Sequence, residues 1–221
     1  MSFGDTQIYF RAMALNLQMA GDTFGRSTPL KDYNYPRLLE WFRLLDRLDV
    51  NCLPPQDLDT CRASTSNYVP GQAAYYFSRS QHPQDVKYVL DYLEEHSMRD
   101  PEANWWWLSQ SIYLANSVLR DKQRAIRIAS ELHKVKADIP LWARQMEAFL
   151  HEDLGDKDKA EQVMCETFQQ AGHLKDASKR EQDFMIHFFE DRMKEALKDR
   201  TLEQVAELCA RKYFSHKKTR S

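Results

Sequence analysis

The sequence predicts an all-α fold, a right-handed solenoid of about five helix-turn-helix hairpins. The composition is the first observation: 221 residues with only 6 glycines, 29% charged side chains and a net charge of -2 exclude collagen-like, linker-like and disordered chains. Apolar residues recur at helical spacing along most of the chain, which is the second. The third is an internal repeat.

The repeat matches the segment around Trp107 with the segment around Trp142, 35 residues further on. Each segment predicts an aromatic-rich helix of about four turns, a short break and a second helix. The breaks are Arg120-Asp121 and Gly155-Asp156, where each Asp is suited to cap the second helix. Ala125 and Ala160 then follow at matched positions, where a small residue allows two helices to cross closely.

These residues resemble the tetratricopeptide-type helix-turn-helix repeat, and residues 154–160 are the closest match to its turn and second helix. The period is one residue longer than the usual 34 of the family. Tyr113 stands where the family has a small first-helix residue, and Ala148 takes that place in the next unit. The resemblance implies a solenoid of helical hairpins over about residues 70–172.

Further helices are expected on both sides of these repeats. Residues 83–93, 69–77 and 35–49 carry apolar residues on one helical face, and residues 6–19 supply a partner for 35–49. A helix over residues 179–198 and a last one, opened by a capping box at Thr201 and closing near Phe214, complete the set. Four prolines are expected to mark helix starts: Pro70, Pro83, Pro101 and Pro140.

One domain is therefore expected over residues 1–214. It comprises an atypical first hairpin at 1–50 with an insertion at 20–32, the clearest repeats at 70–172 and C-terminal helices at 176–214, followed by a flexible basic tail at 215–221. The insertion is a natural place for function. Arg26 within it either contacts a ligand or partner or pairs locally with Asp22.

No catalytic motif accompanies this fold. Neither a Gly-rich phosphate loop nor GxSxG occurs, so we expect no enzyme and no cofactor. Glu147 and His151, and likewise His187 and Asp191, are four residues apart on predicted helices. Metal sites of helical bundles use Glu and His three apart instead, so surface ion pairs and a partly buried histidine are expected, and no metal.

The four cysteines are too few and too scattered for a disulfide framework or a zinc site. Cys52 and Cys61 flank a predicted turn and either form a disulfide in an oxidising compartment or remain two thiols in a reducing cytosol. Cys165 and Cys209 fall on apolar helical positions and are expected to be small core residues.

Aromatic residues of the first helices are the candidates for binding. Three consecutive tryptophans, 105–107, point in different directions around a helix. They cannot all face the protein core, so at least one lies near the surface. Core packing between hairpins is the simpler role, but solenoids bind partners on their first helices. The partner-binding hypothesis rests on five residues of the first helices, Trp105, Trp106, Tyr113, Trp142 and Arg144, with Arg26 of the insertion as a sixth candidate.

Charge and hydropathy limit the partners. No apolar run approaches the length of a membrane span, the N-terminus shows no signal peptide, and no basic stripe is suited to nucleic acid. Residues 22–35, 73–78 and 105–108 are similar to uncharacterised alphaproteobacterial-type tetratricopeptide-like proteins that carry an N-terminal membrane anchor. This resemblance implies association with a membrane or a membrane complex, in preference to a free cytoplasmic protein.

The expected function is a non-enzymatic adaptor or assembly subunit that binds a protein segment on its first-helix face. The alternative is a structural subunit of a membrane-associated complex, held through the 20–32 insertion and the helix ends. A helical-bundle metalloprotein or enzyme is the third and least supported class.

Overall fold

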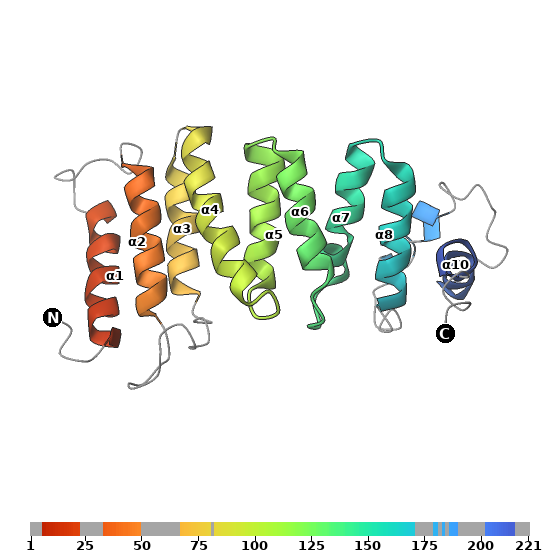
Figure 1. Ribbon diagram of the computed structural model, residues 1–221, viewed down its shortest axis with the longest axis horizontal. Helices are drawn as coiled ribbons and strands as arrows, with labels where there is room; N and C mark the ends of the chain where they lie inside the picture. The colour runs from red at the N-terminus through yellow and green to blue at the C-terminus, as the bar shows by residue number, and fades with distance from the viewer. Residues whose placement is uncertain are drawn as a thin grey trace. The chain divides into compact units, whose positions relative to one another are not determined.

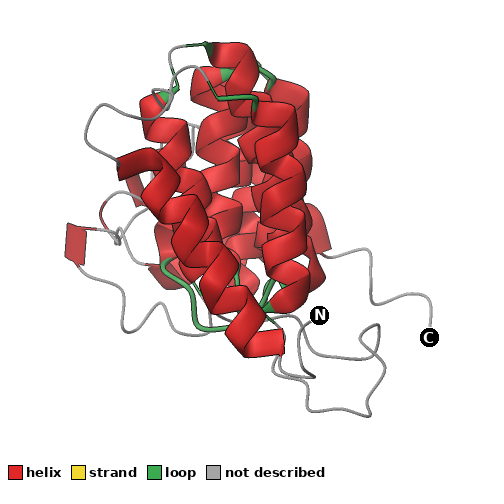
Figure 2. Cartoon of the chain, turned by 90° about the vertical axis from the view of Figure 1, so that its left-hand side faces the viewer, coloured by secondary structure: helices red, strands yellow, loops and turns green. Residues whose placement is uncertain are grey.

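The computed structural model describes residues 6–22, 33–49, 67–80, 82–170, 179–180, 183, 186–189 and 202–214. Over these ranges every regular element is a helix (Figure 2), which confirms the all-α prediction. The α-helices are α1 (Thr6–Asp22), α2 (Tyr35–Leu48), α3 (Tyr68–Arg79), α4 (Pro83–Arg99), α5 (Trp105–Tyr113), α6 (Lys122–His133), α7 (Leu141–Asp153), α8 (Lys157–Gln170) and α10 (Leu202–Cys209). Two π-helical segments, η3 (Leu114–Val118) and η5 (Ala210–Phe214), continue α5 and α10.

The contacts of the chain group into two compact units, where the sequence suggests a single domain over 1–214. The first contains residues 1–128 and 135–137, and the second contains residues 129–134 and 138–221. The division falls inside α6.

Helix α2 buries one face in the core of the first unit. Its inner face buries Tyr35, Leu38, Phe42 and Leu45, the i, i+3, i+4 pattern of an amphipathic helix. The helix packs against α1, α3 and α4, and α1 to α5 lie side by side in chain order (Figure 1). The helices meet mainly through large buried side chains, each removing apolar surface from water.

The start of α2 is defined by local chemistry. Asn34 caps the helix, because its side-chain oxygen accepts a hydrogen bond from the Arg37 amide at 3.1 Å. Pro36 follows in the first turn, where its missing amide costs nothing. The buried Tyr35 hydroxyl donates to the carbonyl of Tyr76 in α3 at 3.2 Å, which ties this end of α2 to its neighbour.

Proline positions predict some helix starts and miss others. Pro83 begins α4 and Pro140 immediately precedes α7, as expected. The prediction for Pro101 is wrong, because α5 begins at Trp105 and Pro101 lies in the preceding turn. Asp100 closes that turn by accepting the Ala103 amide at 3.2 Å. Pro70 is the third residue of α3, which begins at Tyr68.

The two breaks of the repeat form the same turn. Asp121 accepts the Arg124 amide on its carboxylate at 3.0 Å, and Asp156 accepts the Lys159 amide in the same way at 3.2 Å. The predicted caps of α6 and α8 are thereby confirmed. The residue before each Asp takes the left-handed conformation, with φ of 55° at Arg120 and 83° at Gly155.

The predicted first-hairpin linker begins later than expected. Helix α1 continues through Asp22, so the first three residues of the 20–32 segment are helical. Arg26 lies outside the described residues, as do Cys52, Cys61, Asp191 and the 215–221 tail.

The second unit is organised around α8. This helix packs against α7 on one side and against α10 on another. Its core joins α7 and α8 to residues from the 186–189 and 202–214 stretches: Ala148, Val163, Met164, Cys165, Phe168, Ile186, Phe188, Phe189, Val205 and Cys209. The described positions within 179–189 are helical, and helical geometry from Leu202 ends at Phe214, as predicted.

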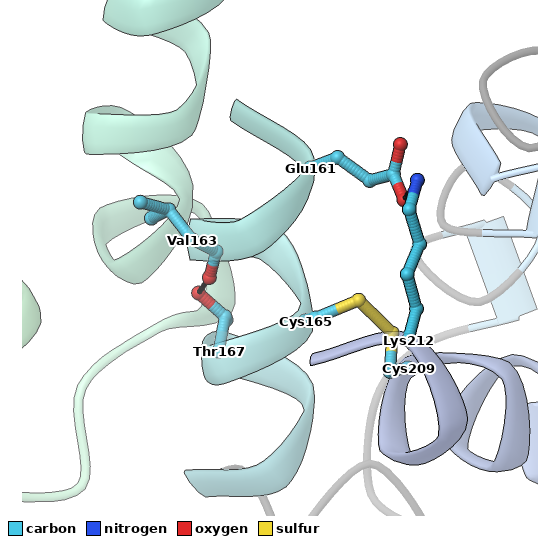
Figure 3. Close-up of a disulfide and its surroundings, with 6 residues drawn as sticks. All are labelled: Glu161, Val163, Cys165, Thr167, Cys209 and Lys212. Carbon is cyan, nitrogen blue, oxygen red and sulfur yellow. Dashed lines mark hydrogen bonds and ion pairs between the residues drawn. A yellow bond between two sulfur atoms is a disulfide. The ribbon is translucent and has the colours of Figure 1, made fainter. Parts of the chain in front are cut away.

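A disulfide joins Cys165 in α8 to Cys209 in α10 (Figure 3). Both cysteines are fully buried, as predicted, but the expectation of two separate small core residues is wrong. Helix packing brings their Cα atoms to 5.4 Å, although they are 44 residues apart in sequence. Beside the bond, Glu161 of α8 and Lys212 of η5, the continuation of α10, form an ion pair at 2.6 Å.

In the described part of the chain, no helix combines the length and the apolar character that crossing a lipid bilayer requires.

Candidate partner-binding surface

The predicted binding residues divide between the two units. Trp105, Trp106 and Tyr113 lie on α5 in the first unit, whereas Trp142 and Arg144 lie on α7 in the second. The sixth candidate, Arg26, is among the residues that the structure does not describe.

On α5, Trp106 and Tyr113 form an exposed pair. Their side chains are 47% and 52% exposed, and their seven-residue separation places them on one face of the helix, two turns apart. Trp105 is half-buried and its ring meets Trp106 edge to face, with centroids 5.9 Å apart. Trp106 is the residue that meets the expectation of at least one surface tryptophan.

Trp107 is held in place within the first unit. Its indole Nε1 donates to the side-chain oxygen of Asn67 at 2.8 Å, and the residue is half-buried. Asn67 immediately precedes α3, so this hydrogen bond fixes the start of one first helix against the start of the next. Trp107 therefore has a structural role.

On α7, Trp142 pairs with a residue that the sequence analysis missed. Trp142 is 42% exposed, and Phe149, seven residues later on the same face, is 38% exposed. Arg144 is half-buried, and its backbone carbonyl lies 3.3 Å from Nδ1 of His133. A search for aromatic residues spaced by seven on both predicted first helices would have found Phe149.

The two exposed pairs occupy equivalent helical positions, 36 residues apart. Residues 105–113 of α5 and residues 141–149 of α7 have the same burial class at seven of nine aligned positions. In this alignment Trp106 corresponds to Trp142, and Tyr113 corresponds to Phe149. With the 35-residue offset of the sequence, the burial patterns do not match. Ile112, which is buried, therefore corresponds to Ala148, and the sequence-based pairing of Tyr113 with Ala148 is wrong.

The π-helical segment η3 causes this change of offset. Its wide turn, with the Leu119 amide donating to the Leu114 carbonyl at 3.0 Å, accommodates one more residue than an α-helical turn. Beyond it, burial again follows the 35-residue offset, as at Ala125 and Ala160. We call Trp106/Tyr113 and Trp142/Phe149 the aromatic pairs.

A buried polar network links α2 to α4 in the first unit. Nδ1 of His96 lies 2.8 Å from Asp46 Oδ1, and the Tyr92 hydroxyl donates to the same oxygen at 3.1 Å. Arg99 pairs with the other carboxylate oxygen. His96 Nε2 is buried without a hydrogen-bond partner in the described part of the chain.

Interactions with His96 and Arg99 favour the ionised form of the Asp46 carboxylate. Burial raises the pKa of Asp46, but the hydrogen bond and charge of His96 together with the Arg99 charge outweigh that effect and hold the pKa below its ordinary value. Burial also raises the pKa of Tyr92 far above its ordinary value, and the Asp46 charge adds to it. Asp46 and His96 are almost fully buried, so their contact joins α2 to α4 inside the first unit.

Acidic and histidine side chains also gather in the second unit. His151 Nε2 lies 3.9 Å from Glu147 Oε1, and His133 Nε2 lies 3.9 Å from Glu166 Oε2. Burial raises the pKa of Glu147, an effect that the charges of His133, His151 and Lys159 oppose. Among the described residues, no three such side chains converge in a metal-binding arrangement.

Comparison of the whole chain with protein-family models, with curated protein sequences and with solved structures finds no match.

Proposed function

We propose that this protein is a non-enzymatic adaptor or assembly subunit that binds a segment of a partner protein on its aromatic pairs. The carrying observation is the recurrence of an exposed pair at i and i+7 on α5 and on α7, at equivalent positions of two consecutive hairpins. Exposed tryptophan and tyrosine supply large apolar contact area and are the residues most enriched at binding hot spots.

The proposal includes the finer architecture, a right-handed, tetratricopeptide-like solenoid. The shared Asp caps and the left-handed residues before them support it, since both hairpins turn in the same way. In such repeat proteins the first helices of successive hairpins form the binding face. The aromatic pairs lie on first helices, which is where a bound segment would contact them.

The polar clusters also favour binding over catalysis. A general acid or base must reach a proton on its substrate, within about 3 Å. Asp46 and His96 bind each other in the protein interior, and Glu147 is buried. Among the described residues, large aromatic side chains are exposed on α5 and α7, and such side chains suit recognition of apolar residues in a peptide.

The experiment compares the proteins retained from a native lysate by the wild type and by two double variants, Trp106→Ala/Tyr113→Ala and Trp142→Ala/Phe149→Ala. Retained proteins are quantified by mass spectrometry, and binding is then measured with the purified partner. We expect at least one partner whose affinity falls about tenfold or more in one of the double variants, because truncation of an aromatic hot spot costs about 2 kcal/mol or more.

Trp41→Ala is the matched control. Trp41 is 41% exposed on α2, a second helix of its hairpin, so its removal deletes a comparable exposed indole away from the aromatic pairs. Far-ultraviolet circular dichroism checks that all variants fold. If every retained partner binds both double variants as tightly as it binds the wild type and Trp41→Ala, the proposal is wrong.

A further inference from the structure

A pocket of about 340 Å³ opens between α1 and α2 in the first unit. This volume lies at the lower end of the range for small-molecule sites. Helix α1 contributes three of the lining residues, and α2 with the two residues before it contributes the rest: Met13, Asn16, Leu17, Tyr33, Asn34, Arg37, Leu38 and Trp41. The walls are largely apolar and aromatic, as in sites that bind the body of an organic ligand.

One of the side chains that line the pocket is charged. Arg37 is the single charged residue among the described residues that line it. The side chain is exposed and forms no ion pair with a carboxylate in the described part of the chain, whereas Arg43, two turns further along α2, is bound by Glu40 and Glu95. A guanidinium beside an apolar pocket is suited to the planar, bidentate binding of a carboxylate.

The backbone adds positive potential beside Arg37. Arg37 lies in the first turn of α2, where the helix dipole is positive, and that turn contains no acidic side chain to neutralise it. Two lining residues, Tyr33 and Asn34, stand just before this turn. Burial raises the pKa of Tyr33 above its ordinary value.

The pocket walls are fixed by a third helix. Tyr76 of α3 donates its hydroxyl to the Leu17 carbonyl of α1 at 2.7 Å. Its ring packs edge to face against Tyr33, with centroids 5.8 Å apart, and against Phe42 of α2 at 6.0 Å. One buried side chain thus holds both walls, which limits the conformational entropy that a ligand would have to remove on binding.

We infer that this pocket binds a small monocarboxylic acid with an apolar body, whose carboxylate pairs with Arg37 while its hydrocarbon part lies against Met13, Leu17 and Trp41. The site is separate from the aromatic pairs and does not depend on the proposed adaptor function. Charge complementarity selects the acid over an amine or an alcohol of the same length, and the apolar walls select it over acetate.

The test uses the purified full-length protein and four small probes: octanoate, octan-1-ol, octylammonium and acetate. Binding is followed by amide chemical shifts in a ¹H–¹⁵N spectrum, which reports both the affinity and the location. We expect saturable octanoate shifts at residues of α1 and α2 that line the pocket. Octanoate should bind about tenfold more tightly than octanol, as for a charge-assisted hydrogen bond, and octylammonium and acetate more weakly still.

Two variants and a control test which residues contact the carboxylate and which contact the hydrocarbon chain of the ligand. Arg37→Gln should lower the affinity for octanoate about tenfold and leave the affinity for octanol unchanged, so that the two probes bind equally. Met13→Gln should weaken both probes, because both bury their chains against this wall. Arg47→Gln is the matched control, since Arg47 is exposed on the same helix but does not line the pocket, and it should bind octanoate like the wild type.

The inference is overturned if octanoate gives no saturable shifts, or if its shifts lie outside the pocket. It is also overturned if Arg37→Gln and Arg47→Gln bind octanoate equally while both keep wild-type spectra. None of these outcomes bears on the aromatic pairs, so the adaptor proposal and the carboxylate site are tested independently.

Discussion

Trp106 in α5 occupies the helical position that Trp142 occupies in α7, although the repeat in the sequence pairs Trp142 with Trp107. The extra residue is accommodated in the π-helical turn of η3. Because of that turn, the buried and exposed positions of α5 are shifted by one residue relative to the 35-residue repeat. Trp106 is therefore exposed, and the indole of Trp107 donates a hydrogen bond to Asn67. A π-helical turn inserted into an α-helix commonly marks such a one-residue insertion.

Deleting Ser117 tests this account of η3. The residue is exposed, and its removal should convert the π turn into a regular α turn while α5 and α6 keep their buried faces. We expect the free energy of unfolding to change by only about 1 kcal/mol, as measured by urea denaturation.

Deletion of Met146 from α7 is the comparison, because that helix has no π turn to absorb the loss. Half of α7 would rotate by about 100°, so buried and exposed positions would exchange. We expect a loss of about 3 kcal/mol or more. Equal destabilisation by the two deletions would contradict the proposed role of η3.

The two left-handed turn residues predict opposite effects of substitution. Arg120→Gly should stabilise the protein by up to about 1 kcal/mol, because it relieves the steric cost of a side chain at φ of 55°. Gly155→Ala should destabilise it by about 1 kcal/mol, since its φ of 83° is unfavourable for alanine although the space around it is open.

Gly71→Ala serves as the control for the glycine effect. Gly71 lies inside α3, and an added Cβ there meets no atom within 4 Å. Alanine should therefore stabilise the helix by about 0.5–1 kcal/mol. Urea denaturation of all three variants measures the signs, and a stabilising Gly155→Ala would refute the turn argument.

Removing the Cys165–Cys209 disulfide should lower the stability of the second unit by about 3–4 kcal/mol, because the bond closes a loop between residues 44 apart. The double variant Cys165→Ala/Cys209→Ala is compared with its parent by urea denaturation. Both carry Cys52→Ser/Cys61→Ser, so that a phosphine reductant can act on one bond only. The reductant should destabilise the parent and leave the double variant unchanged, and any other pattern counts against the bond.

Asp46 should confer stability that depends on pH. Its folded-state pKa lies below the ordinary value of 3.8, so its contribution is complete well above that pH and is lost as the pH falls below it. Asp46→Asn should cost about 3–5 kcal/mol at pH 7, because it leaves buried partners without their anion.

The cost of Asp46→Asn should therefore shrink as the pH falls below 3.8, which urea denaturation at a series of pH values would measure. Glu40→Gln is the matched control: Glu40 is exposed and pairs with Arg43 on its own helix, so its loss should cost less than about 1 kcal/mol. A pH-independent cost of Asp46→Asn would show that the ion pairs of this network do not stabilise the fold.

The features that the sequence determined by itself are local ones. A helix cap needs only the first turn that it serves, so Asp121 and Asp156 could be assigned from their places before two amphipathic segments. The same holds for the buried face of α2, where the spacing of Leu38, Phe42 and Leu45 already defines the inner side. Surface exposure of one tryptophan in 105–107 also followed from helical geometry alone.

Tertiary structure alone decided the features that depend on which helices meet. Asp46 and His96 are 50 residues apart, and Cys165 and Cys209 are 44 apart, so nothing in their local sequence marks them as partners. Which tryptophan of α5 faces outward is likewise decided by packing. The sequence allows Trp106 or Trp107, and the choice depends on the extra residue being accommodated in η3. The candidate surface therefore required the structure, even though the helices that carry it did not.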